Sequence, residues 1–241
     1  MNTNTINLSI VIPAYNEEDN APLLIKNLSN ICKKNKQIEI IVVENGSTDN
    51  TRNVLMSLKH HAEIDGLKIL FLDKNMGYGG GISEGLKVAN GRFLGWTHAD
   101  LQTDPEDLIL CLNFLQNESK IFIKGFRKGR GILDRFFSFI MGIVESLIFN
   151  SSLKEVNAQP TIFPKSLINN FDELPKDFMI DLYIFVKAKF HNLKIKRFEV
   201  QFPDRRHGNS SWNRGFFDVL KFSVATIRKS LKIKKDENYK A

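Results

Sequence analysis

Polar side chains that can bind a metal ion and phosphates follow an apolar stretch near the middle of the chain. His98, Asp100 and Gln102 stand at alternate positions behind the run 91–96, and an Asp-Pro pair then marks the start of a helix. Alternate positions of an extended strand face one side, so we expect these side chains to converge. The oxygens of Asp100 and Gln102 suit Mg²⁺ or Mn²⁺, which shares its coordination shell with substrate phosphates. The alternative is a polar strand end that only caps the next helix.

Two glycine-containing turns add weaker signals. In the segment 44–51, Gly46 permits a tight turn, the Ser, Thr and Asp residues after it cap a helix, and the Glu44 carboxylate can accept hydrogen bonds from a base or a ribose. A capped turn without a ligand explains this segment equally well. The segment 75–81 is a glycine-rich start of a helix, which lets backbone amides approach a phosphate, although such loops are common.

The elements that must position these residues alternate between strand and helix. Strands are predicted from short apolar runs at 8–13, 38–43, 67–72, 91–96 and 120–125. Helices are predicted between and after them at 17–35, 49–60, 78–90 and 104–116. Repetition of this βαβ unit predicts an α/β fold with a mostly parallel sheet. Such sheets bind ligands at the carboxyl ends of their strands, where the polar clusters lie.

The second half of the chain is less regular. Residues 132–149 form a strongly apolar helix, but Glu145 interrupts it and the uncharged stretch is too short to span a bilayer. We expect this helix to lie on a membrane or in a core. A strand pair at about 155–163 and 194–200 flanks a helix at 178–191. An amphipathic terminal helix is predicted from apolar residues that share one helical face, Phe217, Leu220, Val224, Ile227 and Leu231.

Composition and charge narrow the classes of protein and partner. A chain of 241 residues with 42% hydrophobic side chains is long enough for one large α/β domain. The net charge is +7, and residues 221–241 contribute +5 of it. No nucleic-acid-binding motif accompanies this basic tail, so we expect an anionic membrane surface rather than nucleic acid as its partner; a solvated tail is the alternative.

The cellular compartment follows from cysteine use and from the start of the chain. Cys32 and Cys111 form no CxxC pair, so neither a zinc site nor a disulfide framework is indicated. The first apolar run is too short for a secretory signal and continues into a proline turn. We therefore expect a cytoplasmic protein that is peripheral on the inner face of the cell membrane.

Six motifs in a fixed order resemble family-2 glycosyltransferases. They are IPAYNE, VENGSTDNT, NMGYGGGISEGLKVANG, THADLQTDP, KGFRKG and FPDRRHGNSS. The most similar branch is that of the polyprenyl-phosphate sugar transferases, such as dolichyl-phosphate mannose synthase. The resemblance implies a GT-A fold, with the transferase domain at 1–211 and an amphipathic basic helix and tail at 212–241. It also implies inverting transfer from a nucleotide diphosphate sugar.

The resemblance assigns roles on the donor side. The positions that it places around the nucleotide sugar are Pro13, Tyr15, Glu17, Glu44, Gly77, His98, Ala99, Asp100 and Arg205. The family's metal motif falls on His98-Ala99-Asp100, and Gln102 matches a glutamine that also faces the metal. Glu44-Asn45 replaces a usual pair of aspartates, and His98 replaces the first aspartate of the metal motif. The identity of the donor is therefore open, and so is the choice of metal between Mg²⁺ and Mn²⁺.

On the acceptor side, the resemblance places Arg127 and Arg135 opposite an acceptor phosphate, and Asp181 where the family carries an acidic residue. The leading hypothesis is transfer to a polyprenyl phosphate, whose oxygen is already anionic and needs positioning by cations. The second hypothesis is transfer to a hydroxyl of a surface glycan, which needs a carboxylate base. A third is a catalytically weak protein that binds nucleotide sugar and acts as an assembly partner.

Overall fold

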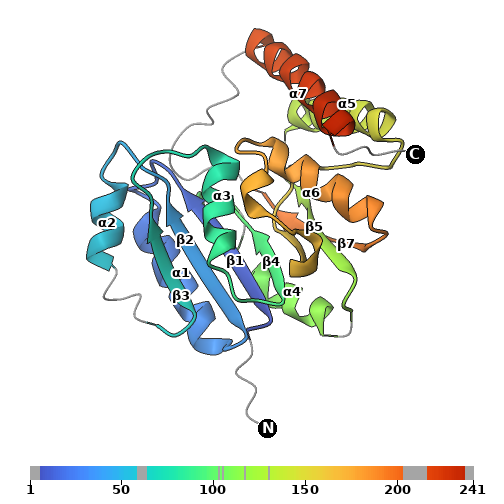
Figure 1. The fold of residues 1–241 in the computed structure, drawn as a ribbon. Coiled ribbons are helices and arrows are strands. Elements are labelled where there is room, and N and C mark those ends of the chain that lie inside the picture. Colours follow the sequence, from blue (N-terminus) through green and yellow to red (C-terminus); the bar gives the residue numbers. More distant parts are fainter. Residues whose placement is uncertain are drawn as a thin grey trace.

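A twisted sheet of seven strands forms the centre of the computed structural model, which describes residues 6–58, 64–102, 104, 106–116, 118–129, 131–202 and 216–236 (Figure 1). The strands are β1 (Leu8–Ala14), β2 (Ile38–Glu44), β3 (Leu67–Phe71), β4 (Phe93–Trp96), β5 (Ile121–Lys128), β6 (Thr161–Pro164) and β7 (Lys194–Gln201). Their order in the sheet is β3-β2-β1-β4-β6-β5-β7. Only β6 runs antiparallel to its neighbours, so the other strands end at one common edge of the sheet.

Helices cover both faces of this sheet, which explains why its central strands are apolar on both sides. On one face lie α1 (Ala21–Lys34), α2 (Thr51–Leu58) and α4 (Asp107–Leu115), which pack on strand residues such as Ile10 and Ile40. On the other face lie α3 (Tyr78–Lys87) and α6 (Met179–Phe190), which pack on residues such as Val11 and Trp96. Two short 3₁₀ helices, η2 (Lys165–Leu167) and η3 (Phe171–Glu173), precede α6.

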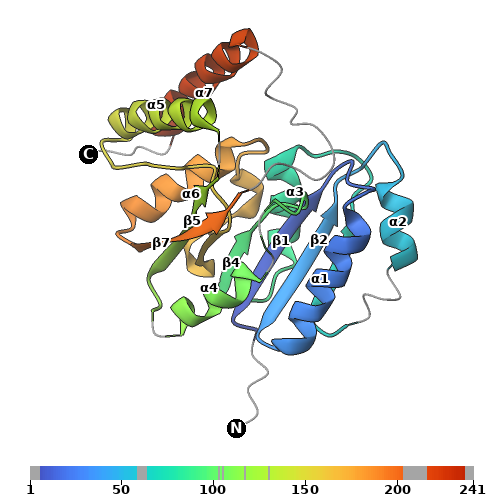
Figure 2. The same cartoon turned by 180° about the vertical axis from the view of Figure 1, so that it is seen from behind.

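Two further helices lie outside these layers. Helices α5 (Ile132–Phe149) and α7 (Phe216–Asp236) run side by side at one end of the molecule, and α7 also contacts α6 (Figures 1 and 2). Within the described parts of the chain, no helix has both the length and the apolar character that crossing a bilayer requires. The predicted domain boundary between residues 211 and 212 lies outside the described residues.

The structure confirms the mostly parallel α/β sheet and corrects the expected strand pair. Strand β6 covers only Thr161–Pro164 instead of 155–163, because residues 155–159 form turns. Strands β6 and β7 are not neighbours, since β5 lies between them and pairs with both. Apolar patterning shows that a segment is a buried strand but does not show which strand pairs with it. The terminal helix is longer than expected and continues to Asp236.

Candidate functional site

The loops after β1 and β2 join at the carboxyl edge of the sheet. The Asn16 side chain donates to Thr48 Oγ1 (3.1 Å) and accepts from the Thr48 backbone N–H (2.9 Å), while the Glu17 N–H donates to Thr51 Oγ1 (2.7 Å). Tyr15, which precedes these hydrogen-bonded loop residues, is 40% exposed, and Pro13 is half-buried. These predicted nucleotide-binding residues therefore lie together along one rim, at the edge where ligands of parallel sheets bind.

The Glu44 carboxylate at the end of β2 is fully buried and is bonded within the protein. It accepts hydrogen bonds from the Ser47 N–H (2.6 Å) and from Arg52 Nη1 (2.9 Å), and Arg52 also donates to the Leu72 carbonyl (2.8 Å). Sequence reasoning missed this ion pair, because Arg52 lies just beyond the recognisable motif. Contact between Glu44 and a base or ribose remains a prediction.

The glycine-rich segment after β3 packs against the chain just before α6. A Cβ atom on Gly77 would lie 2.4 Å from the Lys176 carbonyl oxygen, and one on Gly79 would lie 2.1 Å from that of Pro175. The Gly80 N–H donates to the Lys176 carbonyl (3.1 Å). These glycines are thus required by close backbone packing whether or not a phosphate binds nearby. The role of Gly77 in binding the nucleotide sugar remains a prediction.

The predicted metal motif forms a turn and does not continue the strand. Strand β4 ends at Trp96, and Leu101 adopts a left-handed conformation (φ 56°). The expected alternation of extended positions is therefore wrong beyond Trp96. Within the turn the Gln102 backbone N–H donates to Asp100 Oδ1 (3.2 Å), and both predicted ligand residues are buried (4% exposed for Asp100 and 9% for Gln102).

The donor set at this turn fits a metal that takes only part of its shell from protein. Among the described residues, no group of three or more His, Cys, Asp and Glu side chains is arranged to hold a metal ion. Asp100 and Gln102 would supply oxygen donors to a hard divalent cation, which takes its remaining ligands from water and phosphate oxygens. Ala99 is buried, and the half-buried His98 places its ring 6.1 Å from that of Tyr78.

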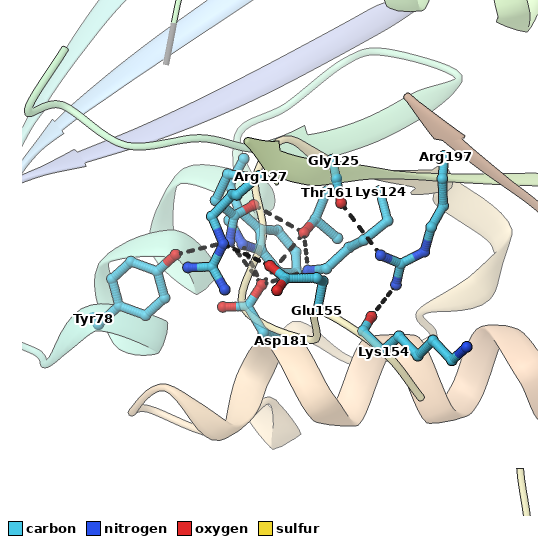
Figure 3. A network of polar contacts seen from close by, with 11 residues as sticks. Tyr78, Lys124, Gly125, Arg127, Lys154, Glu155, Thr161, Asp181 and Arg197 are labelled. Atoms are coloured by element: carbon cyan, nitrogen blue, oxygen red, sulfur yellow. Dashed lines mark hydrogen bonds and ion pairs between the residues drawn. The ribbon is translucent and has the colours of Figure 1, made fainter. Parts of the chain in front are cut away.

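The Asp181 carboxylate lies at the centre of a buried polar network (Figure 3). Its Oδ1 accepts from Lys124 Nζ (2.9 Å), Gln159 Nε2 (2.7 Å) and Trp96 Nε1 (3.2 Å), and Thr161 Oγ1 lies 3.3 Å away. Lys124 is fully buried, and burial lowers its pKa to about 8, although the charge of Asp181 acts in the opposite direction. Asp181 is the only member of this network that the sequence singled out.

The two predicted acceptor arginines occupy different environments. Arg127, near the end of β5, donates from Nε to Glu155 Oε2 (2.8 Å), and its guanidinium lies over the Phe202 ring. Arg135 is exposed in the first turn of α5, and no described contact joins it to Arg127. Arg205 and the rest of its R-x-x-G-x-S segment lie outside the described residues.

Arg197 on β7 is a further cation near Arg127 that the sequence did not indicate. It donates to the backbone carbonyls of Gly125 and Lys154, and these bonds hold the segment before β6 against β5 (Figure 3). Burial lowers the pKa of Arg197, and the charge of Arg127 contributes in the same direction. The end of β5 is therefore a region of concentrated positive charge, with Glu155 as its counterion.

A protein-family model and several curated proteins match this chain. The model described as "Glycosyl transferase family 2" matches residues 9–164, which is more than half of the chain. An undecaprenyl-phosphate 4-deoxy-4-formamido-L-arabinose transferase of Yersinia enterocolitica is 37% identical over 102 residues, covering 42% of this chain and 31% of the relative. A dodecaprenyl-phosphate galacturonate synthase of Rhizobium johnstonii is 30% identical over 129 residues, covering 52% of this chain and 37% of the relative. The chain thus spans about a third of the length of these relatives.

Solved structures of sugar transferases share the fold. Mannosyl-3-phosphoglycerate synthase from Rubrobacter xylanophilus superposes with a TM-score of 0.68 at 17% identity, covering 98% of this chain and 76% of that protein. Glucosyl-3-phosphoglycerate synthase from Mycobacterium tuberculosis, in complex with Mn²⁺, UDP-glucose and phosphoglyceric acid, gives a TM-score of 0.66 at 16% identity, covering 94% and 80%. At such identities the similarity concerns the fold alone, and it confirms the predicted GT-A fold.

Proposed function

The chain belongs to glycosyl transferase family 2, and from this premise we propose that it moves a sugar from a nucleotide diphosphate sugar to a polyprenyl phosphate at the inner face of the cell membrane. An oxygen of the lipid phosphate attacks the anomeric carbon as the bond to the diphosphate breaks, so the configuration inverts and a nucleoside diphosphate leaves. Two curated relatives act on polyprenyl phosphates according to their names, which supports this choice of acceptor.

The donor side of this reaction needs compensation for the charge of the leaving diphosphate. Asp100 and Gln102 would hold a Mg²⁺ or Mn²⁺ ion, which supplies that compensation when bound. The buried position of both side chains keeps them fixed before the donor arrives. Arg205 is proposed to support the same diphosphate, as the resemblance implies.

The acceptor side of the site favours a phosphate over a hydroxyl. Asp181, the candidate base, is paired with the buried ammonium of Lys124 and accepts two further hydrogen bonds, from Gln159 and Trp96. Protonation of this carboxylate would weaken that ion pair, which makes Asp181 a poor acceptor for the proton of a sugar hydroxyl. A phosphate acceptor needs no such base, because it already presents an anionic oxygen, and Arg127 and Arg135 are proposed to position it.

The main support for a lipid acceptor is that α5 exposes its apolar face and buries the charged residue Glu145. Its exposed face is apolar and consists of Phe136, Phe139, Ile140, Ile143 and Leu147. Glu145 lies on the opposite face and is only 6% exposed, and burial raises its pKa to about 7. A helix that faces water has the reverse arrangement. The apolar face of α5 is therefore suited to acyl chains.

Exposed basic side chains on the neighbouring helix α7 suit anionic headgroups. On α7, which packs against α5, Arg228, Lys232 and Lys235 are exposed. Lys229 and Lys234 instead anchor the helix, through Asp177 and the Ile148 carbonyl respectively. An apolar stripe next to cations is the pattern of a helix pair that lies in the plane of a membrane interface.

We expect the double variant Phe139→Ser/Leu147→Ser to lose binding to liposomes that contain anionic lipid. These side chains are 62% and 76% exposed, so replacing them leaves the protein core intact. Each contributes at least about 1.5 kcal/mol when buried in acyl chains, so we expect the partition coefficient measured by co-sedimentation to fall about a hundredfold. Wild-type binding should also weaken with rising salt, since each basic residue near the surface contributes about 1 kcal/mol.

The matched control is Leu110→Ser, which removes an exposed leucine from α4 on the body of the protein (52% exposed). It should bind liposomes as the wild type does. Equal binding by the wild type and the α5 double variant would show that α5 does not face lipid and would remove the main support for a lipid acceptor.

A further inference from the structure

The hydrogen positions in the Asp181 network are fixed by the chemistry of its members. An ammonium group only donates hydrogen bonds and a carboxylate only accepts them. Thr161 Oγ1 therefore accepts from Lys124 Nζ (2.5 Å), and its own hydrogen can serve Gln159 Oε1 (2.8 Å). This arrangement orients the Gln159 amide with its nitrogen toward Asp181 (2.7 Å), and the same nitrogen lies 3.2 Å from the Tyr78 hydroxyl oxygen.

The Tyr78 hydroxyl is consequently an acceptor within this network. Gln159 Nε2 donates to its oxygen (3.2 Å). Burial raises the pKa of Tyr78 well above its usual value, and the charges of Asp181 and Asp100 add to that effect, so the phenol keeps its proton. Among the described residues, no group accepts that proton.

Several contacts place Tyr78 between the network and the predicted metal motif. It is the first residue of α3, its ring stacks on that of Phe178 (4.8 Å between centroids), and the His98 ring lies 6.1 Å away. The close packing of Gly77 and Gly79 against residues 175–177 fixes the start of α3 and therefore the phenol. The Tyr78 residue as a whole is half-buried, so part of it is open to solvent.

We propose that the Tyr78 hydroxyl donates a hydrogen bond to an oxygen of the bound donor, either a diphosphate oxygen or a hydroxyl of the transferred sugar. This inference rests on the proposed function. It also assigns a role to the buried network, because Lys124, Asp181 and Thr161 orient the Gln159 amide that donates to the phenol, and this leaves the phenolic proton for the donor. Tyr78 is a binding residue that neither the motifs nor the resemblance assigned.

The test compares Tyr78→Phe with the wild type by isothermal titration calorimetry in the presence of Mn²⁺. UDP, GDP, CDP and dTDP are titrated first, and the nucleotide that binds the wild type most tightly is then titrated again as its glucose or mannose conjugate. Tyr78→Phe should weaken binding of the nucleotide sugar about tenfold. If the bond goes to the diphosphate, the free nucleotide weakens equally; if it goes to the sugar, only the conjugate weakens.

Two controls separate a binding role from a structural one. Tyr183→Phe removes another hydroxyl from the same side of the sheet, one that accepts from Lys187, and should bind as the wild type does. The Tm of Tyr78→Phe should stay close to that of Tyr183→Phe, because Gln159 still donates to Asp181. Equal affinity of Tyr78→Phe and wild type for both probes would overturn the inference alone. Failure of the wild type to bind any nucleotide would overturn the proposed function and the inference with it.

Discussion

Asp100→Asn is expected to lower kcat/KM for sugar transfer by more than about a hundredfold. The substitution removes one negative charge from a buried side chain that would hold the divalent cation, so metal and diphosphate binding weaken together. Initial rates of nucleotide release at several Mn²⁺ concentrations measure the effect. His98→Ala should reduce the rate less, because a half-buried imidazole adds no anionic ligand.

The control for this prediction is Asp172→Asn, which changes a surface carboxylate paired with Lys87. It should leave the rate unchanged, and excess chelator should stop turnover of the wild type. Full activity of Asp100→Asn, or turnover that persists in chelator, would contradict a metal held at this turn.

Arg127→Ala and Arg135→Ala are each expected to reduce kcat/KM for a lipid phosphate by more than tenfold. A lost charge-assisted hydrogen bond to phosphate costs roughly 1.5–3 kcal/mol, which corresponds to a factor of about ten to a hundred. Asp181→Asn should retain measurable turnover, since the anionic acceptor needs no base. The three variants are compared at saturating donor with the acceptor concentration varied.

Interpretation of Asp181→Asn requires a control for stability, because this substitution leaves the buried ammonium of Lys124 without its partner. Removing one partner of a buried ion pair lowers the free energy of unfolding by about 3–5 kcal/mol. The double variant Lys124→Gln/Asp181→Asn removes both charges and is expected to recover most of that stability. If the double variant is folded but inactive while both arginine variants are nearly normal, Asp181 is the base and the acceptor is a glycan hydroxyl.

The sequence predicted the parts of the site that follow single strands. Polar residues behind an apolar run must lie at the carboxyl edge of a parallel sheet, so the placement of Glu17, Glu44 and Asp100 at one edge followed from local pattern and connectivity. Residues 9–164, which match the family model, contain these segments. The five strands predicted between residues 8 and 125 were also found there, because βαβ repetition allows few topologies, whereas the strand predicted at 155–163 was too long.

The remaining features depend on contacts between segments that are distant in the sequence. Lys124 and Asp181 meet only because β5 lies beside β6 and under α6, and no local pattern predicts a buried lysine. The four residues of β6 also give no sign that this strand runs antiparallel to its neighbours. The apolar pattern of α5 predicted a strongly apolar helix but not which of its faces is buried, since Glu145 is buried while Phe136 and Phe139 are exposed.

The central claim is that the acceptor is a polyprenyl phosphate, and product analysis tests it most directly. The purified protein is incubated with Mn²⁺ and a panel of nucleotide sugars, with undecaprenyl phosphate or undecaprenol supplied in the same detergent, and lipid products are identified by mass spectrometry. We expect one donor to yield a glycosylated undecaprenyl phosphate and no donor to modify undecaprenol. Transfer only to an added glycan hydroxyl, or nucleotide binding without any transfer, would contradict the proposed function.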